Sequence, residues 1–211
     1  VSHTQEDFEN KIKKLLKISS GDLLSWTIRR QSLDARKKPE LFFVYTVEAE
    51  VKKEKQVLKK VNNKNIMSTT PVRFSYLKTN TEVSQRPVIV GSGPAGLFCA
   101  YYLVQAGLKP LIIERGEDVE NRLKTVEKFW ETGELKKESN VQFGEGGAGT
   151  FSDGKLNTLV KDTKGRNQEV LKIFVKFGAP EEILYQQKPH LGTDMLIGIV
   201  KNMRNCIKNA G

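Results

Sequence analysis

The first apolar pattern along the chain is helical. Between Asp7 and Lys17 the apolar residues recur every three or four positions, which predicts an amphipathic helix. Thr4 is the expected N-cap, with Asp7 at the third helical position to complete a capping box. The polar run Ser20-Gly21-Asp22 is expected to end this helix.

The next apolar segments favour strands. Residues 41–51 are rich in aromatic and β-branched side chains and predict a strand, and the alternation of Val72, Phe74 and Tyr76 predicts another. Residues 52–65 are rich in Lys and Asn, which suggests an insertion or an irregular helix. A small α+β domain is expected, with a ferredoxin-like arrangement as the first hypothesis.

A second pattern starts after a polar stretch. Residues 79–86 carry mostly polar side chains directly ahead of an apolar strand, so we place a domain boundary there, between domains 1–85 and 86–211. Strands are expected at 88–90 and 111–113, on either side of a helix over 94–106 that Gly107 ends. This β-α-β order predicts an α/β, Rossmann-like domain.

Three later segments have helical periodicity. One apolar helical face is formed by Val119, Leu123, Val126, Phe129 and Trp130. Another helix contains Val170, Leu171, Ile173, Phe174 and Phe177, and Gly178 and Pro180 end it. The last helix runs through Cys206 to Lys208 and takes Thr193 as its N-cap.

Composition separates the two halves of the 211 residues. Sixteen of the 17 glycines follow residue 86, whereas residues 1–85 carry +7 of the net charge of +10. A basic domain leaves a nucleic-acid role open. The basic cluster lies near Trp26 and comprises Arg29, Arg30, Arg36, Lys37 and Lys38. A solvated face is the favoured reading of this cluster over a phosphate-binding patch, since no nucleic-acid-binding motif accompanies it.

Several classes of protein are excluded. Two cysteines are too few for a disulfide scaffold or for a zinc or iron–sulfur site built from cysteines. With only two histidines besides, a closed structural zinc site is not the favoured reading, and no metal site is expected. Cys99 and Cys206 are expected to be small core residues. Neither belongs to a C-x-x-C pair, so no redox-active disulfide is expected. No apolar run approaches the roughly 20 residues that cross a bilayer, and no secretory segment is visible. A cytoplasmic location is expected.

The strongest chemical motif is G-x-G-x-x-G at Gly91, Gly93 and Gly96. In this motif the first glycine permits a tight turn, the second admits a pyrophosphate close to the backbone, and the third lets helix and strand pack. Pro94 suits the first helical turn, and the helix start would stabilise a diphosphate. Glu114 ends the second strand 23 residues after Gly91, where an acidic residue that binds ribose is expected.

A second glycine cluster follows. Residues 144–154 contain five glycines in eleven positions, interrupted by Phe151, and Phe143 precedes them. Such a loop exposes backbone donors and lets the backbone approach a flat ligand. Ser152, Asp153 and Lys155 add polar side chains. A flexible surface loop is the alternative, and His190 is either an acid–base group or a structural loop residue.

Together these segments resemble a known family. The runs V-I-V-G-S-G-P-A-G, I-I-E-R and N-V-Q-F-G-E-G-G-A-G-T-F-S-D-G-K-L are similar to the FAD-dependent dehydrogenases often labelled NAD(FAD)-utilizing dehydrogenases, and to the wider two-dinucleotide-binding-domain flavoproteins. The resemblance covers residues 86–211, and S-L-D-A-R-K-K with F-V-Y resembles the family's small N-terminal α+β domain. Members usually exceed 400 residues, so we expect this chain to be the N-terminal portion of a longer protein.

The resemblance implies a cofactor and its binding residues. The FAD diphosphate would be held by Gly91, Ser92, Gly93, Pro94, Ala95 and Gly96. Glu114 would bind the adenosine ribose, and Arg115 would lie near the adenine. The flavin side would be lined by Gly146, Gly147, Ala148, Gly149, Thr150, Ser152, Asp153 and Lys155. The expected activity is flavin-dependent hydride transfer to or from a small-molecule substrate that the sequence does not identify. NAD(P)H is the candidate electron donor. No catalytic residue is assigned.

Two other functions remain open from the sequence. A nucleotide-binding protein could use its basic N-terminal domain to bind RNA, although nucleic acid is not the favoured partner. An NAD-only dehydrogenase is disfavoured, because a single nicotinamide site does not require the second glycine cluster.

Overall fold

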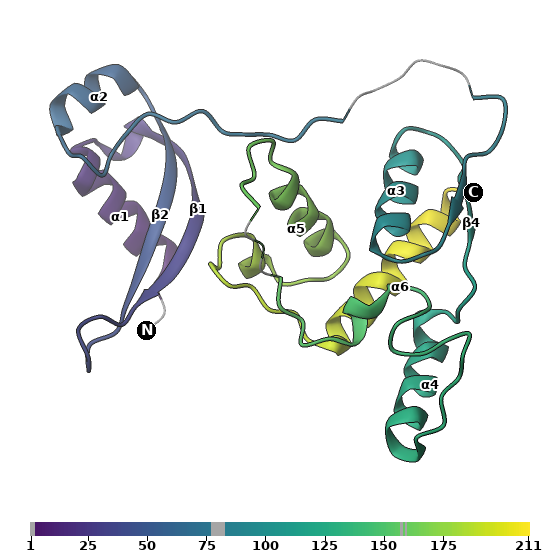
Figure 1. Ribbon diagram of the computed structural model, residues 1–211. Helices are drawn as coiled ribbons and strands as arrows, with labels where there is room; N and C mark the ends of the chain where they lie inside the picture. The colour runs from purple at the N-terminus through teal and green to yellow at the C-terminus, as the bar shows by residue number, and fades with distance from the viewer. Residues whose placement is uncertain (1–2, 77–82, 157, 159) are drawn as a thin grey trace. The chain divides into compact units, whose positions relative to one another are not determined.

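The structure, a computed structural model, describes residues 3–76, 83–156, 158 and 160–211. The chain divides into two compact units (Figure 1). The N-terminal unit comprises Val1–Arg73 and Leu184–Gln187, and the glycine-rich unit comprises Phe74–Ile183 and Lys188–Gly211. Half of the expected boundary segment, residues 79–82, lies outside the described residues. The division into domains 1–85 and 86–211 stays a prediction.

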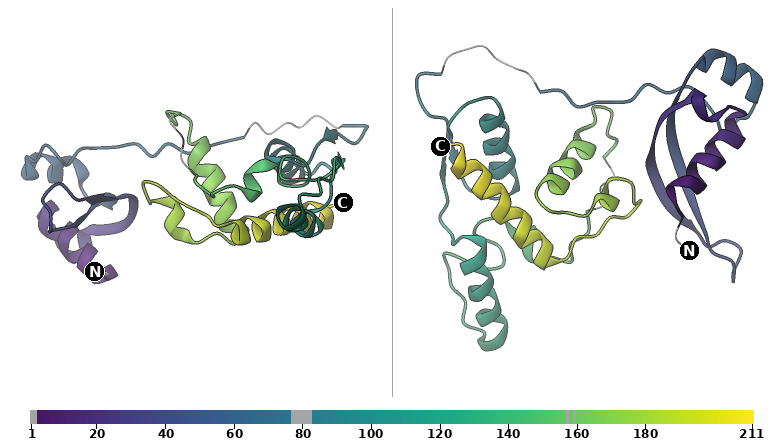
Figure 2. Two further views of the ribbon diagram at one scale, coloured as in Figure 1. Left: turned by 60° about the horizontal axis from the view of Figure 1, so that its bottom comes forward. Right: turned by 180° about the vertical axis from the view of Figure 1, so that it is seen from behind.

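The N-terminal unit is a long β-hairpin covered by two helices. Its elements are α1 (Gln5–Leu16), the short 3-10 helix η1 (Ser20–Asp22), β1 (Leu23–Asp34), β2 (Phe42–Val51) and α2 (Glu54–Val61). β1 and β2 pair antiparallel, and both helices lie on one side of the hairpin (Figures 1 and 2). Ile12 and Val57 are buried, and the Phe8 ring stacks on Trp26 with centroids 5.2 Å apart.

The start of α1 matches the sequence pattern. Asp7 N donates to Thr4 Oγ1 at 3.2 Å, and Thr4 N donates to Asp7 Oδ2 at 2.8 Å, which completes the predicted capping box. Replacing Thr4 with alanine removes one acceptor from the first turn. We expect Thr4→Ala to lower the free energy of unfolding of this unit by about 1 kcal/mol, measured by urea denaturation. Thr4→Ser keeps the acceptor and should cost less than half as much.

Other expectations for this half need correction. Val72, Phe74 and Tyr76 form no strand, because the backbone of residues 71–76 pairs with no described strand. The Phe74 and Tyr76 rings instead pack near Tyr102, with centroids 6.0 Å and 5.2 Å from that ring. Within 52–65 the structure has the regular helix α2. The ferredoxin-like hypothesis is not confirmed, since the described sheet of this unit contains only β1 and β2.

A distant segment joins the N-terminal unit at β1. Gln31 N donates to Tyr185 O at 2.7 Å, and Gln187 N donates to Gln31 O at 3.0 Å. Gln186 therefore forms a parallel bridge with Gln31. These bonds explain why Leu184–Gln187 belongs with the first part of the chain.

The glycine-rich unit contains the predicted β-α-β motif. Its elements are β3 (Val88–Val90), α3 (Pro94–Gln105), β4 (Leu111–Ile113), α4 (Val119–Thr132), η2 (Ala148–Phe151), α5 (Arg166–Lys176), η3 (Glu181–Leu184) and α6 (Thr193–Asn209). β3 and β4 pair in parallel, as a crossover through α3 requires. Gly107, with φ +79°, follows the end of α3 and confirms the predicted helix stop.

The core of this unit lies on one face of the β3–β4 pair. Ile89 and Ile112 pack against a cluster to which α3 contributes Leu97 and α6 contributes Ile199 and Met203. Neighbouring residues of a strand point to opposite faces. The other face of the pair accordingly carries exposed apolar side chains from Val88, Val90, Leu111 and Ile113.

Three single-residue expectations in this unit were wrong. Trp130 is 59% exposed, although it shares the helical face of the buried Val119 and Val126; it lies in the last turn of α4. Cys99 is exposed on α3 rather than in the core. Thr193 is the first residue of α6, and its N-cap is Gly192.

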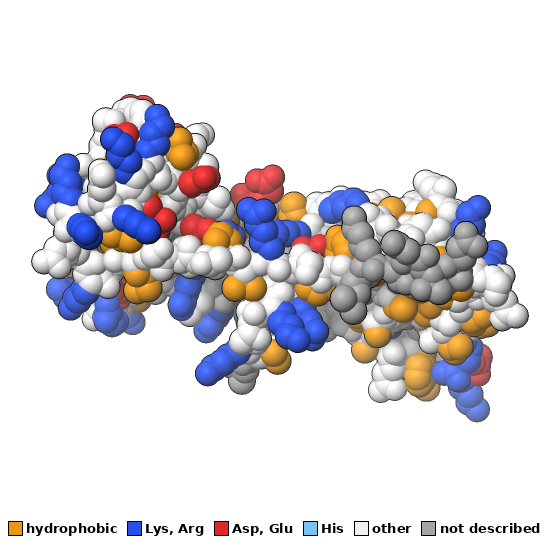
Figure 3. All heavy atoms as spheres, turned by 90° about the horizontal axis from the view of Figure 1, so that it is seen from above, with side chains coloured by type: hydrophobic (Ala, Val, Ile, Leu, Met, Phe, Trp, Pro, Cys, Tyr) orange, Lys and Arg blue, Asp and Glu red, His pale blue; other side chains and the backbone are white. Residues whose placement is uncertain are grey.

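The basic cluster of the N-terminal unit is partly neutralised. Arg29 pairs with Glu48, and Arg36 pairs with Asp34 at 2.6 Å. Lys and Arg side chains are nevertheless the most frequent charged groups over this unit in Figure 3. Among the helices of the described residues, none has the length and apolar character needed to cross a membrane.

Candidate functional site

The first glycine loop, residues 91–96, connects β3 to α3. Gly91 has φ +95°, and its amide donates to Ile113 O at 2.7 Å, which ties the loop to β4. Gly93 is the N-cap of α3, and Pro94 and Ala95 are exposed in the first turn. A Cβ on Gly96 would overlap the Gly91 carbonyl oxygen, whereas a Cβ on Gly93 would have no neighbour within 4 Å. Close helix–strand packing therefore requires Gly96 but not Gly93.

Glu114, directly after β4, hydrogen-bonds to the first glycine loop. Its Oε2 accepts from Ser92 N at 2.6 Å and from Ser92 Oγ at 2.8 Å, and its Oε1 accepts from Gly116 N at 2.8 Å. Burial alone would raise the pKa of Glu114, but these hydrogen bonds outweigh burial and hold the pKa below its usual value. Glu114 is therefore a carboxylate at neutral pH and lies beside the first loop.

The second glycine loop, residues 140–151, touches the first. Gly146 N donates to Ser92 O at 2.9 Å. A Cβ on Gly147 would lie 2.8 Å from Pro94 Cδ, so glycine at this position permits the close approach. The structure thus brings Gly146 and Gly147 next to the first loop, although about 50 residues separate the two loops in the sequence.

A buried arginine that the sequence analysis missed organises the second loop. Arg122 on α4 has no exposed surface. Its guanidinium donates to five backbone carbonyls, those of Asn140 (2.9 Å), Val141 (2.8 Å), Gly144 (3.4 Å), Glu145 (2.7 Å) and Gly147 (2.8 Å). The Phe151 ring lies 4.7 Å from the guanidinium carbon. Burial lowers the pKa of Arg122, opposed by the charges of Glu114 and Glu145, and arginine stays protonated in proteins.

Glu145 connects this loop to two helices. Its Oε2 accepts from Val119 N at 2.8 Å at the start of α4 and from Arg204 on α6 at 2.7 Å. Arg204 also donates to Glu120 at 2.7 Å. Burial raises the pKa of Glu145 despite these hydrogen bonds, because the side chain is only 5% exposed. The loop, α4 and α6 therefore share one charged network.

The remaining predicted residues divide between the site and the surface. Ala148 and Gly149 are exposed at the start of η2, and Thr150 is buried. Arg115 lies over the Phe143 ring at 4.8 Å. Ser152 Oγ donates to Gly149 O at 2.8 Å.

The last charged residues of the prediction pair with each other. Asp153 and Lys155 form an exposed ion pair of 2.7 Å, and neither has a polar contact with the first loop among the described residues. The exposed residue His190 forms an isolated antiparallel β-bridge with Lys155. Within the described part of the chain, no cluster of three His, Cys, Asp or Glu residues could hold a metal ion.

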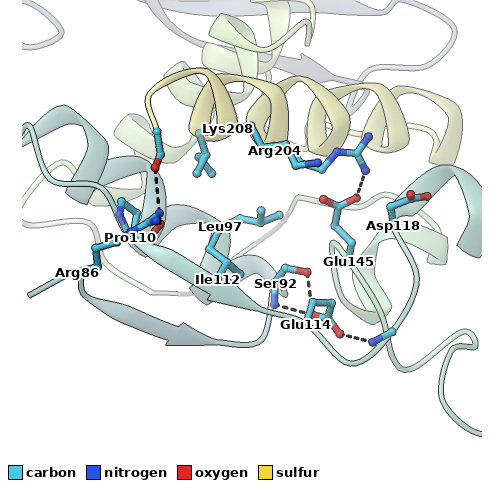
Figure 4. A pocket seen from close by; sticks show the side chains of 13 residues that line it. Arg86, Ser92, Leu97, Pro110, Ile112, Glu114, Asp118, Glu145, Arg204 and Lys208 are labelled. Atoms are coloured by element: carbon cyan, nitrogen blue, oxygen red, sulfur yellow. Dashed lines mark hydrogen bonds and ion pairs between the residues drawn. The ribbon is translucent and has the colours of Figure 1, made fainter.

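A cleft of about 410 Å³ lies beside the first loop, between β4 and α6 (Figure 4). Ser92, Glu114 and Glu145 line one part of it, whereas Arg86 and Lys208 lie toward the other. Arg86 is held by the carbonyls of Lys109, Pro110 and Gly211. The cleft thus offers both negative and positive groups next to a helix start.

Comparisons with protein families identify two segments. Residues 89–143 match the family described as NAD(P)-binding Rossmann-like domain. Residues 1–50 match a domain of unknown function (DUF8436). The glycine-rich unit therefore contains a Rossmann-like domain of the nucleotide-binding class found in oxidoreductases. This match confirms the α/β, Rossmann-like fold class of the glycine-rich unit, and it supports a nucleotide-type cofactor, without showing which nucleotide.

Comparisons with individual proteins add one long match and several short ones. An uncharacterized protein of Clostridium beijerinckii is 49% identical over 204 residues, which cover 96% of this chain and 38% of that protein. The chain thus spans well under half the length of this relative. Thiamine thiazole synthases of Saccharolobus islandicus and Saccharolobus solfataricus are 68% identical over 28 residues, 13% of this chain and 10% of each enzyme.

Proposed function

We propose that the glycine-rich unit binds FAD and is part of a flavin-dependent oxidoreductase. The FAD diphosphate would lie at the start of α3, against the first glycine loop. Glu114 would accept hydrogen bonds from the adenosine ribose through lone pairs that Ser92 and Gly116 leave free. The second glycine loop would face the flavin half of the cofactor. Bound flavin would supply the hydride-transfer chemistry. The residues of this chain do not identify the substrate or the electron donor.

The observation that carries this proposal is the free space at Gly93. Gly93 is the N-cap of α3, and a Cβ there would meet no protein atom within 4 Å, so a ligand can approach the backbone at this helix start. Open space also lies at Gly149 in the second loop. Exposed helix-start amides next to an empty volume are suited to a diphosphate.

The second glycine loop favours FAD, because a single nicotinamide site does not require a second glycine-rich loop beside the first. The Gly146–Ser92 hydrogen bond holds the second loop beside the first. A dinucleotide that extends from the α3 start past Pro94 would meet the second loop directly. The short identity with thiamine thiazole synthases, enzymes of a flavoprotein-type family, agrees with this choice.

The test replaces Gly93 with asparagine in the protein expressed from its complete gene. Asparagine is a good N-cap, so the melting temperature should change by less than about 3 °C. Its side chain would occupy the diphosphate volume, so FAD affinity should fall by about 100-fold or more, which corresponds to ~2.8 kcal/mol. Flavin absorbance of the purified protein and fluorescence titration with FAD measure the effect.

Gly21→Asn in η1 is the matched control, because a Cβ there also meets nothing within 4 Å. It should leave FAD binding unchanged. A colourless wild-type protein that takes up no FAD would reject the proposal. Tight binding of NAD(H) without FAD would instead support the alternative, an NAD-only dehydrogenase.

A further inference from the structure

The geometry of Arg122 sets the direction of the peptides around it. In a trans peptide the C=O and N–H groups point in opposite directions. Each carbonyl that accepts from Arg122 therefore turns the next amide away from the guanidinium. Two of these amides, Gly146 N–H and Ala148 N–H, belong to the part of the second loop that meets the first.

These two amides have different environments. Gly146 N–H donates to Ser92 O in the first loop, so one peptide links Arg122 directly to that loop. Ala148 N–H follows the Gly147 carbonyl that Arg122 holds, and it has no acceptor among the residues that the structure describes. Ala148 is exposed and borders the open space at Gly149. A donor in this position is available to a ligand.

The charge of Arg122 adds to this orientation. Among the residues that the structure describes, no carboxylate accepts a hydrogen bond from the guanidinium, because its five acceptors are all backbone carbonyls of the second loop. A hydrogen-bonded peptide transmits part of a neighbouring charge by polarisation, which makes its own N–H a stronger donor. The buried cation therefore strengthens the donors that point away from the guanidinium.

We propose that Arg122 is a positioning residue for the diphosphate of the bound dinucleotide. It fixes the second loop so that the Ala148 amide faces the anion and the Gly146 amide holds the two loops together. This role rests on the proposed function of the site. Arg122 acts through the backbone and does not touch the ligand.

The test compares Arg122→Met with Val126→Ala in the full protein. Met has a similar length without charge or donors, and Val126 is a fully buried residue of the same helix that makes no hydrogen bond to the loop. Two quantities are measured, the hydrogen exchange of amides 141–149 in the nucleotide-free protein and the dissociation constants for FAD and ADP. Thermal melting gives the stability of each variant.

Arg122→Met is expected to accelerate exchange in the loop by about tenfold or more and to weaken FAD and ADP by about tenfold or more. Val126→Ala should lower the melting temperature without changing either quantity by more than about twofold. If Arg122→Met does not fold, Arg122→Lys serves, because an ammonium with three donors keeps the charge but cannot hold five carbonyls. The lysine variant should change both quantities in the same direction.

Three outcomes would overturn the proposal. Unchanged loop exchange in Arg122→Met would remove the positioning role. Faster exchange with unchanged nucleotide affinity would leave Arg122 as a structural residue only. Equal losses of affinity in Arg122→Met and Val126→Ala would point to general destabilisation. A wild-type protein that binds neither FAD nor ADP would instead reject the proposed function, on which this inference rests.

Discussion

Arg204→Met is expected to lower the free energy of unfolding by about 3–5 kcal/mol at neutral pH, since it leaves the Glu145 carboxylate buried without its cation. Glu145 is 5% exposed and would retain only the Val119 amide among its present polar partners. Glu120, the other partner of Arg204, keeps Lys201 at 3.3 Å. Chemical denaturation of the two proteins measures the loss.

The pH dependence of this loss identifies its cause. Burial already raises the pKa of Glu145, and removal of Arg204 raises it further. A carboxyl group whose folded pKa exceeds its unfolded pKa binds more protons when folded, so stability rises as pH falls through the folded pKa. The loss should therefore shrink as the pH is lowered from neutral through the folded pKa of Glu145. Arg204→Met/Glu145→Gln should recover part of the stability at neutral pH, and a loss independent of pH would contradict this explanation.

Gly96→Ala is expected to cost more than about 4 kcal/mol or to prevent folding. The new Cβ would overlap the Gly91 carbonyl oxygen, and neither β3 nor the start of α3 can retreat without breaking the β-α-β packing. Melting temperature and soluble yield measure the effect.

Gly93→Ala, three residues earlier, is the matched control. Its Cβ meets nothing within 4 Å, and the loss of a glycine N-cap should cost about 1 kcal/mol or less. Similar losses for both alanine variants would show that the tight approach of α3 to β3 does not decide stability.

The sequence predicts the parts of the site that depend on local spacing. The strand before Gly91, the helix after Pro94 and the strand that ends at Glu114 all follow from short-range pattern, and the structure contains them. Which of these residues bind a ligand stays a prediction. The contact between Gly147 and Pro94 could not be foreseen, because it depends on how the chain returns after α4.

Arg122 shows why a buried charge is easily missed. Charged residues on an amphipathic helix are normally assigned to the solvent side. Val119, Arg122 and Val126 nevertheless share the spacing of one helical face, and both valines are fully buried. A single arginine within an apolar stripe was the available signal. Its role depends on carbonyls from residues 140–147, which spacing alone does not reveal.

The errors elsewhere have related causes. The apolar pattern does not predict β1, because Arg29 and Arg30 interrupt its alternation, at a register shift between Ile28 and Arg30. Alternating side chains in residues 72–76 suggested a strand, but alternation predicts a strand only where a neighbouring strand can accept its hydrogen bonds. The exposed Cys99 lies on a largely apolar helix, whose composition gives little indication of which side faces water.

The bonds of Arg122 also limit which mutations the second loop can accept during evolution. The guanidinium contacts main-chain oxygens, which every amino acid carries, so Val141 and Gln142 can change without loss of these bonds. Gly144 has less freedom, since its φ is +118° and a Cβ would lie 2.7 Å from Arg122 Cδ. Sequence divergence among distant homologues should therefore concentrate at the side chains between the fixed peptides, while Arg122 and Gly144 change rarely and together.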